Sequence, residues 1–220
     1  VNINGTPTCV SAINGQDSAC IPYNLFFGGS NLDDGLTAVV DAGTANALDL
    51  ILTDTDVNAL TLTLTDTVVD VVKLNALDLK TSVAINATTV TGLTGTVAAD
   101  FIAVLTNSAD TGLDGDEAVT VTGAIAVADA NAIDAATTGI VTASITETDL
   151  TTLATLTDAN GNNAYTATVD DVSVDATDLV ALNAAVATLT VDAAVVTVTE
   201  DAVAIGANAV NVTDALALTA

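Results

Sequence analysis

The chain has 220 residues, no His, Trp or Met, and two basic residues against 28 acidic ones, so its formal net charge is −26. Most catalytic schemes need a side chain that titrates near neutrality or a cation that stabilises developing negative charge, so this composition argues against an enzyme. It also argues against a nucleic-acid-binding protein, which needs a basic surface, and leaves cations and copies of the chain as the expected partners.

The apolar content indicates a folded chain in spite of the high charge. Hydrophobic residues make up 50% of the sequence, which is outside the low-hydrophobicity range of disordered proteins. The longest uncharged stretch, residues 81–99, is rich in Thr and Gly, so we expect no membrane insertion. The acidic surface and the depletion of Lys are typical of a saline, extracellular setting.

Residues 1–37 differ in composition from the rest and are predicted to form an N-terminal connector or cap. They contain Cys9 and Cys20, which we expect to form a disulfide, although two buried free thiols are the alternative. A metal site is disfavoured because the chain has no third Cys and no His. Tyr23, Phe26 and Phe27 follow the second cysteine and are predicted to contact a neighbouring subunit.

Residues 38–220 carry an internal repeat. A four-residue box of the type Asn-Ala-Leu-Asp or a weaker variant recurs with steps of 22 to 29 residues, most of them close to 28. The boxes begin at residues 46, 75, 103, 131, 153, 180 and 208. Asp residues often precede the boxes and are suited to cap a short helix or turn, as in 128–134 and 175–179.

Alternating apolar and Thr residues fill the segments between the boxes. Examples are 60–65, 119–122, 165–169 and 195–199. This pattern predicts strands with one apolar face and one Thr face. A unit of this size cannot bury its apolar face alone, so we predict an all-β fold, a β-solenoid of about 28-residue coils with short helical corners. A β-sandwich is the alternative.

Two loops have the oxygen-rich spacing of a calcium site. The first contains Asp110, Asp114, Asp116 and Glu117, and the second contains Asp158, Asn160 and Asn162. Alternate oxygen-bearing side chains with an intervening Gly resemble the first half of a Ca²⁺ loop. Polar turns are the competing interpretation, because Asp, Asn and Gly are the usual turn residues. Calcium is the one cofactor that the sequence suggests.

Two segments resemble known families. Residues 117–123 and 127–139, with 74–78 and 91–100, resemble repeats of large acidic cell-surface proteins of cyanobacteria, and this likeness covers about residues 70–185. It implies a surface location and repetition, and no activity. Residues 9–26 are similar to a cysteine-paired loop of TonB-dependent outer-membrane receptors. That similarity implies a disulfide and an extracytoplasmic location.

We therefore expect a structural subunit of an extracellular filament or surface layer. Repeat units whose strands remain unpaired at an end can accept another copy, and a head-to-tail contact that does not close builds fibres. The alternative is a calcium-stabilised adhesin or matrix repeat module of a larger surface protein.

Overall fold

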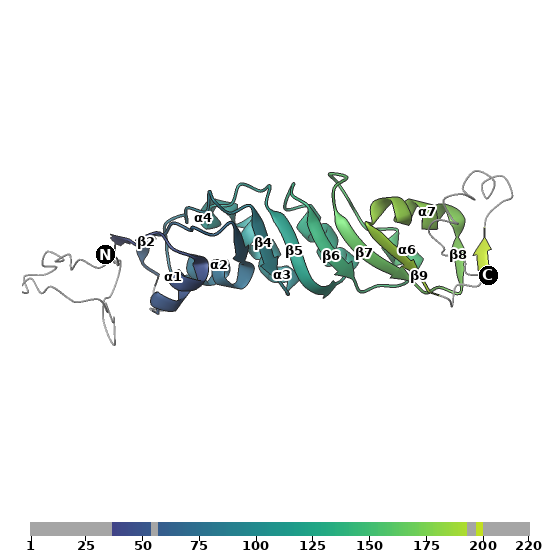
Figure 1. Ribbon diagram of the computed structural model, residues 1–220, viewed down its shortest axis with the longest axis horizontal. Coiled ribbons are helices and arrows are strands. Elements are labelled where there is room, and N and C mark those ends of the chain that lie inside the picture. Colours follow the sequence, from purple (N-terminus) through teal and green to yellow (C-terminus); the bar gives the residue numbers. More distant parts are fainter. Residues whose placement is uncertain (1–36, 54–56, 193–196, 200–220) are drawn as a thin grey trace, which may run out of the picture.

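The computed structural model describes residues 37–53, 57–192 and 197–199, and the described part is an elongated stack of strand and helix units (Figure 1). Residues 1–36 lie outside it, so the N-terminal connector, its boundary near residue 37 and the Cys9–Cys20 pairing stay predictions. The contacts predicted for Tyr23, Phe26 and Phe27 lie outside the described residues as well.

The main sheet has six parallel strands, and its strands follow the order of the chain. They are β3 (Val68–Asp70), β4 (Gly92–Gly95), β5 (Ala118–Ile125), β6 (Val141–Ile145), β7 (Ala164–Val169) and β9 (Thr188–Val191). Two parallel pairs flank this sheet. They are formed by β1 (Thr37–Val39) with β2 (Ala59–Thr61), and by β8 (Ser173–Asp175) with β10 (Thr197–Thr199).

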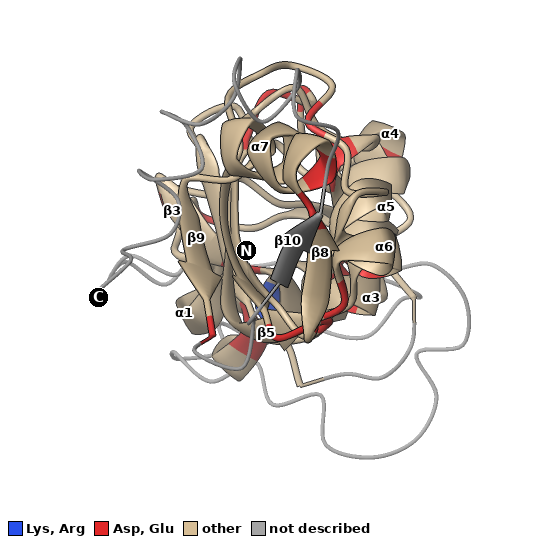
Figure 2. Cartoon of the chain, turned by 90° about the vertical axis from the view of Figure 1, so that its right-hand side faces the viewer, with Lys and Arg blue, Asp and Glu red and all other residues tan. Residues whose placement is uncertain are grey.

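Helices connect the strands. They are α1 (Ala45–Ile51), α2 (Val71–Asp78), α3 (Ala98–Thr106), α4 (Ser108–Thr111), α5 (Val127–Asp134), α6 (Leu150–Leu153) and α7 (Ala176–Ala185). The view along the stack shows the strands β3 and β9 on one side and the helices α3 to α6 on the other (Figure 2). The main sheet therefore has one face against the helices and one face away from them.

The step of the stack is set by the strand register. Paired residues are 20 to 26 positions apart, from Ala124 with Ser144 to Gly92 with Ala118. Isolated bridges continue similar steps toward the N-terminal end, for example between Gly43 and Leu64. The predicted step of about 28 residues is the spacing between successive boxes, which lie in the helices. The spacing between paired residues of successive strands is somewhat smaller.

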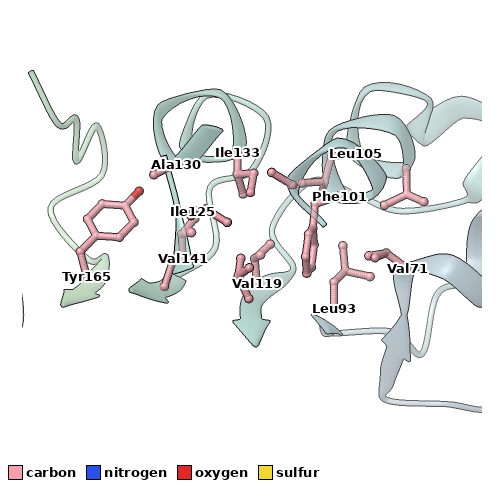
Figure 3. Packing of buried hydrophobic residues seen from close by; sticks show 14 of the residues in the cluster. Val71, Leu93, Phe101, Leu105, Val119, Ile125, Ala130, Ile133, Val141 and Tyr165 are labelled. Carbon is pink, nitrogen blue, oxygen red and sulfur yellow. The ribbon is translucent and has the colours of Figure 1, made fainter. Parts of the chain in front are cut away.

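The core lies between the sheet and the helices. Val119 and Val141 point inward from β5 and β6, and Phe101 and Ile133 meet them from α3 and α5 (Figure 3). Leu60, Leu62 and Leu64 are likewise buried, which confirms the alternation predicted for residues 60–65. Burying a large aliphatic side chain stabilises a fold by about 1.5–3 kcal/mol. Because the buried side chains of successive units form one cluster, each unit depends on its neighbours for part of this stabilisation.

The predicted all-β solenoid is wrong, and so is the β-sandwich alternative. The described residues form a mixed α/β structure with a single main parallel sheet and seven helices. The boxes that begin at residues 46, 75, 103, 131, 153 and 180, predicted to form short helical corners, lie in these helices or overlap their ends, and the box at 208 lies outside the described residues. The signal for helix was a three-residue apolar spacing, such as Val71, Leu74 and Leu77 in α2, all of which are completely buried.

Candidate functional site

The four-residue boxes form polar contacts between successive units. In the boxes that begin at residues 75 and 131 the third residue, Leu77 or Ile133, is completely buried, so the box is fixed against the core. The Asn that opens the box reaches the following unit. Asn75 Nδ2 donates to the Asp100 carbonyl at 3.3 Å, and Asn131 Nδ2 donates to the Thr155 carbonyl at 2.8 Å. The same contact in two units gives the Asn at this position of the repeat a structural role.

The Asp that closes the box accepts a hydrogen bond from an Asn of the next unit. Asn107 Nδ2 donates to Asp78 Oδ2 at 3.1 Å, and Asn163 Nδ2 donates to Asp134 Oδ1 at 2.7 Å. Both pairs are separated by 29 residues. Burial raises the pKa of the Asp78 carboxyl, and the bond from Asn107 opposes that rise. The donor Asn residues escaped the sequence analysis because they lie outside the boxes.

Asp134 is the most deeply buried of the box carboxylates. The residue is 3% exposed. Its Oδ2 accepts hydrogen bonds from Thr157 Oγ1 at 3.0 Å and from the Ala159 N–H at 3.1 Å. Asn163 in turn accepts a bond from the Val141 N–H through its Oδ1 at 2.8 Å. One carboxylate therefore holds the loop before β7 and, through Asn163, the start of β6.

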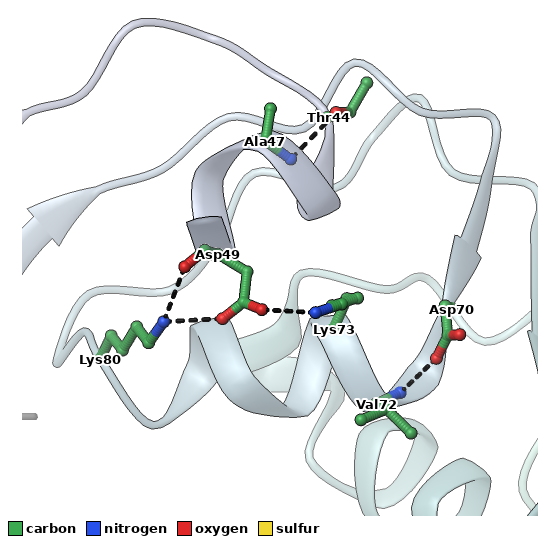
Figure 4. Close-up of polar contacts among 7 residues, drawn as sticks. All are labelled: Thr44, Ala47, Asp49, Asp70, Val72, Lys73 and Lys80. Carbon is green, nitrogen blue, oxygen red and sulfur yellow. Dashed lines mark hydrogen bonds and ion pairs between the residues drawn. The ribbon is translucent and has the colours of Figure 1, made fainter. Parts of the chain in front are cut away.

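Asp49 closes the first box and binds both basic side chains of the sequence. Lys73 Nζ lies 2.7 Å from Asp49 Oδ2, and Lys80 Nζ lies 2.7 Å from Asp49 Oδ1 (Figure 4). Lys80 also donates to the Asp49 carbonyl at 3.2 Å. The hydrogen bond from Lys73, followed by that from Lys80, lowers the pKa of Asp49, and the same contact raises the pKa of Lys73. The rare cations thus connect α1 to the unit of α2.

Acidic side chains also cap helices of the preceding unit. Asp66 accepts from the Ala45 N–H at 2.7 Å, Glu147 from the Val127 N–H at 3.0 Å, and Asp171 from the Leu150 N–H at 2.6 Å. Each acceptor lies 20 or 21 residues after the first residue of the helix that it caps. A carboxylate at this place satisfies an N–H without an intrahelical partner and interacts favourably with the helix dipole.

Local caps follow the sequence prediction in part. Asp175 accepts from the N–H groups of Thr177 and Asp178, at 2.8 and 3.3 Å, and this confirms the capping expected in 175–179. In 128–134 the expectation is wrong, because the N-cap of α5 is Ala126 and makes no side-chain bond. Glu147 of the next unit supplies that cap instead.

Threonine hydroxyls form a third set of contacts between units. Thr81 Oγ1 donates to the Leu60 carbonyl at 2.6 Å, Thr137 to the Glu117 carbonyl at 2.9 Å, and Thr146 to the Ile125 carbonyl at 3.2 Å. Each hydroxyl reaches a carbonyl 20 or 21 residues earlier in the chain. These bonds supplement the backbone ladder and explain part of the Thr content of the repeat.

The first predicted calcium loop is organised around a buried glutamate. Glu117 is 1% exposed and accepts from the N–H groups of Asp114 and Gly115, at 2.9 and 3.1 Å. Burial raises the pKa of Glu117. A hydrogen bond between the two carboxyl groups lowers the pKa of Asp114 and raises that of Asp116, whereas Asp110 is exposed on α4. Glu117 therefore closes a turn through the backbone.

The second predicted loop is a turn as well. Asp158 Oδ1 accepts from the N–H groups of Asn162 and Asn163, at 3.0 and 3.2 Å, and Asn162 Nδ2 donates to the Thr138 carbonyl at 3.3 Å. Asn160 is exposed. Within residues 37–53, 57–192 and 197–199 there is no group of three or more His, Cys, Asp or Glu side chains placed to hold a metal ion. Calcium binding stays a prediction.

Tyr165 is a buried polar residue that sequence analysis missed. It lies on β7 with 0% exposure, and its hydroxyl has no hydrogen-bond partner in the structure. Burial raises the pKa of Tyr165, and the charges of Asp134 and Asp158 raise it further. Its aromatic ring fills the core beside α5 (Figure 3), which is the role that we assign to it.

Comparisons with known proteins add no family to these observations. No family model, curated protein or solved structure matches the chain. Among the described residues, no helix combines the length and the apolar composition needed to cross a membrane. The resemblance to cyanobacterial surface repeats and to the receptor loop stays an untested expectation from the sequence.

Proposed function

We propose that the chain is a structural protein whose units assemble head to tail into an extracellular filament or surface layer. The observation that carries this proposal is the growth of the main sheet by one strand per unit, in chain order and always in parallel. The sequence resemblance to acidic cell-surface repeats of cyanobacteria supports the extracellular location.

The edge at β9 is the surface that can extend such a stack. β9 pairs with β7 on one side, and no strand of the described residues pairs with its other side. Alternate N–H groups of a strand point to opposite neighbours. The Asp192 N–H donates to the Val169 carbonyl, so the N–H groups of Thr188 and Thr190 also point toward β7 and that of Leu189 points away from it. Because no strand of the described residues covers it, this edge can accept a further parallel strand from the chain or from another copy.

The contacts between units support the same proposal. The box Asn and Asp residues, the cross-unit caps and the Thr hydroxyls all connect one unit to its neighbour, so the side chains of each unit are used mainly for stacking. A neighbouring copy that continued this register would use the same kinds of bond. The role needs no bound cofactor and no reacting group.

Electron microscopy and sedimentation velocity of the 220-residue chain test the proposal. We expect filaments that lengthen with protein concentration and with NaCl, because salt screens repulsion between chains of charge −26. Leu189→Pro removes an edge N–H while leaving the donors that face β7 in place, and it should shorten or abolish the filaments. Leu189→Ala keeps that N–H and is the matched control.

The two variants also separate assembly from folding. Both variants lose the same partly buried Leu side chain, so their melting temperatures should lie within a few degrees of each other. Particles that stay monomeric at every salt and protein concentration would contradict the proposal. Filaments of equal length from the proline variant and the parent chain would rule out β9 as the contact.

A further inference from the structure

The face of the main sheet that points away from the helices is lined by small hydroxyl side chains. Inward positions of these strands are apolar and are buried on β5, β6 and β7 and partly buried on β9. The outward positions carry Thr, Ser, Ala or Gly from β4 to β9, and most of them are exposed on β5, β6, β7 and β9. The exposed hydroxyl residues include Thr120, Thr142, Ser144, Thr166, Thr188 and Thr190. We call this surface the threonine face.

The side chains of the threonine face form rows across the strands. Thr94 pairs with Thr120 and Thr120 with Thr142 in one row. In a second row Ser144 pairs with Thr166, and Thr166 pairs with Thr188. Neighbouring strands of a sheet lie about 4.8 Å apart, so the rows repeat at that spacing. The result is a regular surface of short side chains.

The threonine face is free of charge, although the chain is strongly acidic. Within the described residues, every Asp and Glu lies outside β4, β5, β6, β7 and β9. Figure 2 shows the acidic residues in red on the helices, on loops and near strand ends. Asp100 on α3 and Asp129 on α5 belong to helices on the opposite side of the stack (Figure 2). Two copies can therefore approach through this face without bringing rows of carboxylates together.

We propose that the threonine face binds the threonine face of a second copy, with the two copies related by a twofold axis. Charge favours this occupant, because a contact through the helix side would place carboxylates of like charge against one another. A carbohydrate surface is a poorer match, since β4, β5, β6 and β9 offer no aromatic side chain and the Tyr165 of β7 points into the core. A nucleic acid would require cations that the face lacks.

The size of the face indicates a weak contact for one pair of copies. Five strands at about 4.8 Å and about six residues at 3.3 Å each give roughly 500 Å² per copy, or about 1,000 Å² in total. That area is at the lower limit for a specific interface. The proposal rests on the structural function given above, because several weak contacts along two filaments would act together and strengthen lateral pairing.

Sedimentation equilibrium of the full chain tests this inference. We expect a monomer–dimer equilibrium whose dissociation constant falls as NaCl rises from low to physiological concentration and above. Thr166→Asp places a carboxylate in the middle of the threonine face and opposite its symmetry mate, and it should weaken the dimer at least about tenfold. Thr151→Asp makes the same chemical change at an exposed position of α6 and should leave the dissociation constant unchanged.

The outcomes separate this inference from the proposed function. Single filaments from Thr166→Asp, beside paired filaments from the parent chain, would support both. Dimers without filaments would support the inference while contradicting the proposed function. Equal weakening by both substitutions, or a chain that stays monomeric at high salt, would overturn the inference. If Thr166→Asp fails to fold, Thr188→Asp in the same row provides the test.

Discussion

Removal of the Asp134 carboxylate is expected to destabilise the stack far more than removal of an exposed carboxylate from the same helix. Asp134 is 3% exposed and accepts hydrogen bonds from Asn163, Thr157 and the Ala159 N–H. Thr157 and Ala159 are exposed, so water can replace the carboxylate as their partner. Asn163 is buried, so its Nδ2 loses its partner without access to water.

The magnitude follows from that difference. A hydrogen bond to a charged group contributes about 1.5–3 kcal/mol, and a buried donor left without a partner costs about 1–3 kcal/mol. Both figures describe the loss of the same Asn163 hydrogen bond, so they are not simply added. We expect Asp134→Ala to lower the free energy of unfolding by about 2–4 kcal/mol. Asp129→Ala, on the exposed side of α5, should lower it by less than about 0.5 kcal/mol.

Urea unfolding followed by circular dichroism gives both values, and a double-mutant cycle isolates the contact. Asp134→Ala and Asn163→Ala should show a coupling energy of about 1 kcal/mol or more, because they remove two ends of one bond. Exchange of the Ala159 amide hydrogen should quicken in Asp134→Ala. A loss of stability equal to that of Asp129→Ala, together with no coupling to Asn163, would refute the reasoning.

Three further predictions concern other contacts between units and the turns that support them. Lys73→Met combined with Lys80→Met should return the pKa of Asp49 from its lowered value toward 3.8, as measured by NMR titration of the carboxyl carbon. Since a lowered carboxyl pKa stabilises the fold above the unfolded pKa and loses that effect as the pH falls through the folded pKa, the parent chain should lose more stability than the double variant on acidification. The pKa of Glu117 is raised from 4.5 by burial, so its ionisation should reduce stability as the pH rises from the unfolded pKa through the folded one. Thermal melts should show a flatter pH dependence over that interval in Glu117→Gln, and an unchanged slope would contradict the assignment. Gly112→Ala should destabilise the chain by at least about 2 kcal/mol, because the residue has φ of +74° and a Cβ would clash with the Ile85 carbonyl. Gly115→Ala, with φ of +86° and no atom within 4 Å of its Cβ, should cost about 1 kcal/mol in the same denaturation assay.

The strands could be predicted from the sequence because their pattern is local. Alternation over residues 60–65 and 119–122 places Leu60, Leu62 and Val119 in the core, as found. The helices were underestimated for a local reason as well. Their apolar stripe is narrow, with one buried residue in three, and Asn, Asp and Thr fill the other positions, so that each box has the composition of a turn.

The contacts between units could not be predicted, because they depend on the register between distant segments. Glu147 caps the helix that begins at Val127 only because the strands step by 20 to 26 residues, and the box spacing suggested about 28. Calcium binding by the two predicted loops stays untested, and their carboxylates have another use in the structure. Glu117 and Asp158 bind backbone N–H groups of their own turns, an alternative that residue spacing does not distinguish from ligand binding.

X-ray fibre diffraction from aligned assemblies tests the central claim most directly. If copies continue the parallel stack head to tail, the strands lie across the filament and each unit adds one strand spacing along its axis. The pattern should then contain a reflection near 4.8 Å along the filament axis. A reflection of that spacing perpendicular to the axis, or assemblies that show no such repeat, would contradict the head-to-tail account.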